Sequence, residues 1–155
     1  MPKIDIPVAP TRVGTDYPPP HDAPVRDRRR QALGDAAGLD QFGVNLMRLP
    51  PGQWSSQRHW HSVEGEVVLV EDEVVLVEDG AETVLRPGDC AGFKAGIANG
   101  HHLENRSDRE AVLLEMGSRR PDRDTCTYTD IDMVARAGED FYRHRDGAPY
   151  GDQNA

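Results

Sequence analysis

Short apolar stretches alternate with polar turns through the middle of the chain, between Phe42 and Glu115. The intervening segments carry turn residues, as in Pro50-Pro51-Gly52. Many short strands at near-even spacing, with no long helical period between them, are typical of an all-β sandwich or barrel. The pattern predicts strands at residues 43–49, 55–61, 66–71, 74–78, 81–85, 90–94, 101–105 and 111–115.

A short repeat occupies the centre of this region. Residues 67–73 read Val-Val-Leu-Val-Glu-Asp-Glu, and residues 74–80 read Val-Val-Leu-Val-Glu-Asp-Gly. A period of seven is too short for a solenoid unit. We expect two strands folded as a hairpin on the acidic corner at residues 71–73, with apolar runs that fit burial on both faces or between sheets.

The two ends of the chain differ from the centre. Residues 1–24 are rich in proline, which fixes φ and lacks a backbone donor, so they predict an extended arm. Residues 25–38 favour a short helix, limited by glycines. Residues 121–155 predict an irregular tail with mobile last residues, which packs on the barrel through Tyr128, Met133 and Phe141. The predicted division is therefore arm and short helix at 1–38, barrel at 39–120 and tail at 121–155.

Length and composition indicate one compact domain. The chain has 155 residues, a mean hydropathy of −0.67 and no aliphatic run longer than four residues, whereas a membrane-spanning helix needs about 20. The first residues lack the apolar stretch of a secretory signal. Cys90 and Cys126 do not form a Cys-x-x-Cys motif, which excludes a thiolate zinc cluster, and we expect free thiols in a cytoplasmic protein.

The net charge of −9 argues against nucleic acid and anionic membranes as partners. One basic cluster, Arg-Asp-Arg-Arg-Arg at residues 26–30, opposes this trend. It has no aromatic neighbours of the kind a nucleic-acid site uses, so we interpret it as a solvated segment that leads into the barrel.

The histidines carry the candidate chemistry. His59 and His61 lie two residues apart in a predicted strand, so their side chains share one face and can converge on one ion. Neutral imidazole suits Zn, Cu, Fe and Ni. Glu66 follows a turn and can add a carboxylate, and His101-His102 opens another strand. The alternative is that these histidines line an apolar cavity or face solvent.

Two segments resemble the paired motifs of the cupin family. The first matches Gly-(six residues)-His-Trp-His-(four residues)-Glu at positions 52, 59–61 and 66. In the second, at residues 88–105, Gly88, Gly96, His101 and Asn105 keep the pattern, Lys94 replaces the usual proline, and the interval before the histidine is two residues longer. The resemblance covers residues 42–117 and implies a double-stranded antiparallel β-barrel, the jelly roll of that family.

Carried over residue by residue, the resemblance implies one divalent metal ion, Fe, Mn, Ni or Zn, held inside the barrel by His59, His61, Glu66 and His101. His101 keeps the three-residue spacing to Asn105. Strand alternation lets only one of two adjacent histidines point inward, so His102 is the alternative ligand. Strand parity and proximity also predict a pocket lined by Ser55, Gln57, Cys90, Phe93 and Leu103.

Four protein ligands leave one or two open positions on a five- or six-coordinate ion, which is typical of catalytic sites. The resemblance therefore implies a metal-dependent enzyme acting on a small organic molecule, by dioxygenase, isomerase or lyase chemistry. Two alternatives stay open: a cupin that binds or senses a small molecule without turnover, and a metal-free sugar-type isomerase with His61 or His101 as the base. Analogy with small cupins predicts a homodimer.

Overall fold

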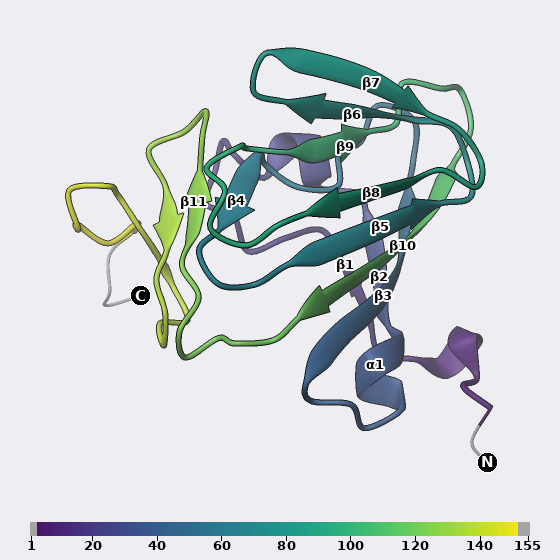
Figure 1. Ribbon diagram of the computed structural model, residues 1–155, viewed down its shortest axis with the longest axis horizontal. Helices are drawn as coiled ribbons and strands as arrows, with labels where there is room; N and C mark the ends of the chain where they lie inside the picture. The colour runs from purple at the N-terminus through teal and green to yellow at the C-terminus, as the bar shows by residue number, and fades with distance from the viewer. Residues whose placement is uncertain (1–2, 152–155) are drawn as a thin grey trace.

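A computed structural model describes residues 3–151, and it is built almost wholly from antiparallel strands (Figure 1). Two 3₁₀ helices, Ile6–Val8 and Ala23–Val25, and one short helix, α1 (Leu33–Ala36), lie near the N-terminus. The strands are β1 (Thr11–Val13), β2 (Arg29–Ala32), β3 (Phe42–Leu49), β4 (His59–His61), β5 (Glu66–Val70), β6 (Val74–Glu78), β7 (Ala81–Leu85), β8 (Cys90–Phe93), β9 (His102–Glu104), β10 (Ala111–Ser118), β11 (Cys126–Tyr128), β12 (Val134–Ala135) and β13 (Tyr142–Arg143).

The strands form three sheets. The largest has the order β1-β2-β3-β10-β5-β8, and the others are β7-β6-β9 and β13-β12-β11-β4. In Figure 1 the β7-β6-β9 sheet lies above the large sheet, and β4 and β11 stand at one end of both. This architecture confirms the predicted all-β antiparallel jelly roll. Within residues 3–151, no helix is long and apolar enough to span a bilayer.

The main core lies between the six-stranded sheet and the β7-β6-β9 sheet. Strand alternation produces it, because every second residue of β3 and β10 points inward. Leu113 of β10 is fully buried and lies opposite Met47 of β3 and Val70 of β5. Each such side chain contributes about 1.5–3 kcal/mol when it is removed from water. The cluster contains Met47, Leu49, Val68, Val70, Val74, Leu76, Leu85, Leu103, Ala111 and Leu113.

The seven-residue repeat does not form the expected hairpin. Its two halves are β5 and β6, and they belong to different sheets: β5 pairs with β8 and β10, whereas β6 pairs with β7 and β9. The acidic corner instead carries the chain from one sheet to the other, and Asp72 anchors it by accepting a hydrogen bond from the backbone N–H of Val112 (3.0 Å). Both halves contribute to the shared core, which explains why both are apolar.

The N-terminal segment departs from the predicted arm and helix. Residues 29–32 form β2, which pairs with β3, and β1 pairs in turn with β2. The unpaired backbone groups along the edge of β3 favour this pairing. The predicted helix over 25–38 shrinks to the four residues of α1.

The C-terminal segment is more ordered than the predicted tail. Its strands β11, β12 and β13 extend from β4, and they bury Tyr128 and Met133 in a second core with Tyr17, Val25 and Cys126. Phe141 is half-buried, with the Arg143 guanidinium carbon 4.6 Å from its ring centroid. The predicted mobility of the last residues concerns 152–155, which lie outside the described residues.

Candidate functional site

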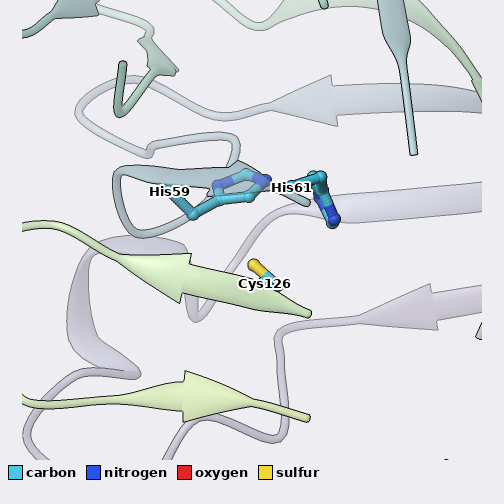
Figure 2. Close-up of side chains that lie close together, drawn as sticks. All are labelled: His59, His61 and Cys126. Carbon is cyan, nitrogen blue, oxygen red and sulfur yellow. The ribbon is translucent and has the colours of Figure 1, made fainter. Parts of the chain in front are cut away.

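Strand β4 places His59 and His61 on one face, as the i, i+2 spacing predicts. Their ring centroids lie 5.0 Å apart. Figure 2 shows both imidazoles extending from β4, with the sulfur of Cys126 nearby on the antiparallel strand β11. Cys126 is the backbone partner of His61 in the β4–β11 pair. The strand is shorter than predicted, because residues 55–58 are bends.

Glu66 and His101 reach His59 from two other segments. Glu66 begins β5, and His101 bridges directly to His59 through two backbone hydrogen bonds of 2.9 and 3.2 Å. The ligand atoms that His59, Glu66 and His101 offer all lie within 4.8 Å of one another. The His101 Nε2 atom lies 3.5 Å from a Glu66 carboxylate oxygen.

His61 belongs to neighbouring groups of donors. Its ligand atom clusters with those of His59 and Cys126, and also with Glu64 and Asp124. The structure thus brings three of the four predicted ligands into one cluster. The fourth, His61, lies beside this cluster, two residues after His59 on β4.

Each of the three imidazoles is held through its Nδ1 atom. The acceptor for His59 is the Gln57 carbonyl (2.9 Å), for His61 the Asp124 carboxylate (2.6 Å) and for His101 the Asn99 carbonyl (3.3 Å). An acceptor at Nδ1 selects the tautomer whose Nε2 lone pair is free, and metal-binding histidines almost always have such a partner. The ring orientation therefore fits the donor set of a metal site.

Electrostatics in the cluster also suit a divalent cation. Burial lowers the pKa of His59 to about 3, and the nearby His61 and His101 act in the same direction, so its imidazole is neutral. Burial alone raises the pKa of Glu66, but the hydrogen bond with His101 and the nearby imidazoles outweigh it and hold the pKa below its usual range. Neutral imidazoles and one carboxylate are ligands for Fe, Mn, Ni or Zn.

His102 points away from this cluster. Its Nδ1 lies 3.1 Å from the Ser56 carbonyl and its Nε2 lies 3.0 Å from a Glu104 carboxylate oxygen. Both ring nitrogens are therefore engaged elsewhere, and alternation along β9 turns the ring to the opposite face from His101. The geometry favours His101 over His102.

A cavity of about 520 Å³ opens onto the cluster. Its walls include His59, Glu66 and His101, together with the predicted lining residues Ser55 and Leu103. The volume falls in the range typical of small-molecule sites, about 300–1,000 Å³.

The other three predicted lining residues do not line this cavity, although Phe93 borders the cluster from another side. Phe93 stacks on His101, with ring centroids 3.5 Å apart, and lines a smaller cavity of about 200 Å³. Cys90 is exposed, because it lies three positions from Phe93 on β8 and so faces the other way. Gln57 is buried against the N-terminal segment, where its amide donates to the His21 carbonyl (2.6 Å); strand parity fails there because residues 55–58 are not a strand.

Asp124 is a site residue that the sequence interpretation missed. Its carboxylate accepts hydrogen bonds from His61 and from the backbone N–H groups of Val63 (2.8 Å) and Glu64 (3.1 Å). Burial acts to raise the pKa of Asp124, but these hydrogen bonds outweigh it and lower the pKa. The residue lies 63 positions from His61 in the tail, so no local pattern links the two.

Glu115 is the second residue that was missed. It lies on β10, lines the 520 Å³ cavity and pairs with Arg30 of β2 at 2.8 Å. Burial raises the pKa of its carboxyl, the nearby Glu66 adds to the effect, and Arg30 opposes it. A sequence signal existed, because Glu115 follows Ala111 and Leu113 at alternate positions and so occupies an inward-facing place in the strand.

A family model of the cupin domain matches residues 45–117. The chain is similar to a crystal structure from Silicibacter pomeroyi that is described as a sugar phosphate isomerase of the cupin superfamily. The two chains are 43% identical, 97% of each chain is covered, and the TM-score is 0.89. A candidate sugar phosphate isomerase from Acidithiobacillus ferrooxidans is 30% identical, with a TM-score of 0.66 and coverage of 76% of this chain and 71% of that chain.

A more distant structure, the polyketide cyclase RemF from Streptomyces resistomycificus, is 16% identical over 76% of this chain and 79% of that chain, with a TM-score of 0.61, and shares the fold alone. No curated protein sequence matches the chain at a significant level. The relatives support an enzyme-like role for the site. With its two motif segments inside the matched region and its likeness to the Silicibacter protein extending over nearly the whole length, the chain belongs to the cupin superfamily.

Proposed function

We propose that the protein is a metal-dependent cupin isomerase acting on a sugar phosphate. The observation that supports the proposal is that each of the three imidazoles is engaged through Nδ1, beside the Glu66 carboxylate, which lies 3.5 Å from His101 Nε2. The proposed ligands of one divalent ion are His59, His61, Glu66 and His101.

The reaction type comes from the relatives. Two similar structures, at 43% and 30% identity, carry the name sugar phosphate isomerase. Such an enzyme moves a proton between neighbouring carbons of an α-hydroxy carbonyl compound, with no change in composition. A bound divalent ion would act as a Lewis acid that polarises the carbonyl oxygen.

Glu115 is the proposed proton carrier. Its carboxylate takes the proton from the hydroxyl-bearing carbon, and the resulting carboxylic acid returns it to the former carbonyl carbon while the hydroxyl proton moves to the carbonyl oxygen. A carboxyl group whose pKa is raised above its usual value by burial is better suited to hold and return a proton. Arg30, 2.8 Å away, keeps the carboxylate oriented in the cavity.

Metal content tests the ligand assignment. Protein purified without added metal, then analysed by mass spectrometry of bound metals, is expected to hold about one ion per chain. His59→Ala and His101→Ala are expected to lose it, whereas His102→Ala keeps it, because both nitrogens of His102 are engaged elsewhere. A wild type that stays empty after anaerobic addition of Fe(II) or Mn(II) contradicts the metal proposal.

Activity is tested separately with a panel of aldose and ketose phosphates followed by NMR. Isomerisation is expected in wild type, and Glu115→Gln is expected to lower kcat by about 100-fold or more, the usual contribution of a general acid–base group. Circular dichroism checks that the variant folds. Turnover of enols or diketones with dioxygen uptake contradicts the isomerase assignment, and ligand binding without turnover indicates a sensing cupin instead.

A further inference from the structure

A second cavity, of about 350 Å³, lies beside the ligand cluster between the N-terminal segment and the C-terminal sheet. Its walls carry the guanidinium groups of four arginines, Arg12, Arg28, Arg30 and Arg136. The chain as a whole has a net charge of −9. A concentration of positive charge in a hollow of an acidic protein needs a physical reason.

Arg28 is the buried member of this group. Its side chain is buried, and its guanidinium donates to the backbone carbonyls of Gly14 (3.3 Å) and Ser55. No carboxylate pairs with it among residues 3–151. Burial lowers the pKa of Arg28, and the neighbouring Arg30 adds to the effect. A buried cation without a counter-ion is costly, so this position favours an incoming anion.

Two other arginines also retain unused donors. The Nε atom of Arg30 is buried and has no hydrogen-bond partner in the described part of the chain, although its terminal nitrogen pairs with Glu115. Arg136 is exposed to the cavity and forms no ion pair with any residue from 3 to 151. The Arg136 guanidinium can therefore donate to a ligand without breaking an existing pair, and the buried Nε of Arg30 can do so only if its side chain shifts.

The acidic groups of the same cavity are occupied by partners. Glu139 is paired with Arg143 through two hydrogen bonds of 2.6 and 2.9 Å, and Asp124 accepts from His61 and the backbone. Glu64 accepts from the backbone N–H of Arg120. Arg12 is paired with Asp16 and Arg30 with Glu115, whereas Arg28 and Arg136 have no carboxylate partner among residues 3–151, and these two leave an excess of positive charge in the cavity. The Tyr142 phenol is a further donor, because burial raises its pKa to about 12 and keeps it protonated.

We propose that this cavity binds the phosphate monoester group of the substrate. A dianion with three acceptor oxygens matches several guanidinium groups better than a single carboxylate does. The cavity shares His59, His61 and Glu64 with the 520 Å³ cavity of the ligand cluster, so one small molecule can occupy both. The assignment rests on the proposed function for its substrate, but phosphate binding itself does not require the metal.

Calorimetric titrations at fixed ionic strength test the proposal with inorganic phosphate, fructose 6-phosphate and fructose as probes. Both phosphates are expected to bind and to compete with one another, and fructose to bind much more weakly. Arg136→Ala is expected to raise the Kd of both phosphates about tenfold, the effect of losing one charge-assisted hydrogen bond. Arg86→Ala, which removes an exposed arginine outside the cavity walls, is the matched control and leaves the Kd unchanged.

Repeating the titrations after EDTA treatment separates this inference from the proposed function. If the protein holds no metal and catalyses no isomerisation, but Arg136→Ala still weakens phosphate binding, the result supports the anion site and contradicts the isomerase proposal. Equal Kd values in wild type and Arg136→Ala, with Arg12→Ala also unchanged, overturn the anion site. Binding of inorganic phosphate that fructose 6-phosphate does not displace overturns its role as a substrate subsite.

Discussion

Hydrogen bonds to Nδ1 decide what the three histidines of the cluster can do. The partners of His59 and His101 are backbone carbonyls two residues away, so their orientation is set locally. The partner of His61 is a side chain, Asp124, which a distant segment supplies. A change at Asp124 therefore tests this support without removing a proposed ligand.

Asp124→Asn is expected to raise the metal Kd by about 10- to 100-fold, the usual effect of altering a group that orients a metal-binding histidine. The amide is a weaker acceptor than the carboxylate and can present its NH₂ group to the ring. Competition with a fluorescent chelator measures the Kd. Asp132→Asn, which alters an exposed aspartate that contacts His144 rather than His61, is the control. An equal change in both variants contradicts the role of Asp124.

Gly100 controls the approach of His101 to β4. A Cβ atom at residue 100 would lie 2.4 Å from both Cγ2 and Oγ1 of Thr129, a branched side chain with little freedom to move. Gly100→Ala is expected to destabilise the fold by about 1–3 kcal/mol through overpacking, as measured by urea unfolding. Adding Thr129→Ala removes the two clashing atoms and restores part of the loss. Strictly additive effects of the two substitutions contradict this explanation.

At the scale of elements, β10 organises the large sheet because it pairs with both β3 and β5. One face of β10 carries Leu113 into the core and Glu115 into the cavity, so the same strand supplies a core residue and a site residue. The N-terminal strand β2 extends the same sheet and delivers Arg30 to Glu115. The site therefore depends on an element whose residues were predicted to form part of a short helix rather than a strand.

Leu113→Ala is expected to destabilise the protein by about 2–5 kcal/mol, the range for a buried leucine whose removal leaves a cavity. Its neighbour Leu114 lies on the opposite face of β10 and is half-buried, so Leu114→Ala is the matched control, with an expected loss of about 1 kcal/mol. Chemical denaturation of both variants measures the difference. A control that loses as much as Leu113→Ala contradicts the assignment of the two faces.

At the scale of the whole molecule, the homodimer stays a prediction. Strand β1 is an edge strand whose three residues are exposed, and Val8 and Val13 are 75% and 61% exposed nearby. Unpaired edges with exposed apolar groups are candidates for pairing with a second chain. Light scattering after gel filtration is expected to give twice the chain mass of 17.2 kDa. A single-chain mass that persists at high protein concentration contradicts the dimer.

Local sequence patterns were sufficient to predict much of the barrel. Strand alternation and turn residues predicted β3 and β5 to β10 to within a few residues, and i, i+2 spacing placed His59 and His61 on one face. These features depend on backbone geometry and on burial of every second side chain, which neighbouring residues already determine. The motif spacing likewise placed Glu66 and His101 close to His59.

Only the tertiary structure decided the other features of the fold and site, because they depend on contacts between residues that are distant in the sequence. The repeat at residues 67–80 is equally compatible with a hairpin and with two strands in facing sheets, and only the shared core distinguishes them. The basic cluster looked solvated, yet Arg28 is buried and Arg30 pairs with Glu115, 85 positions away. A charged side chain becomes part of a site when the fold removes its water and supplies a partner, and no local pattern carries that information.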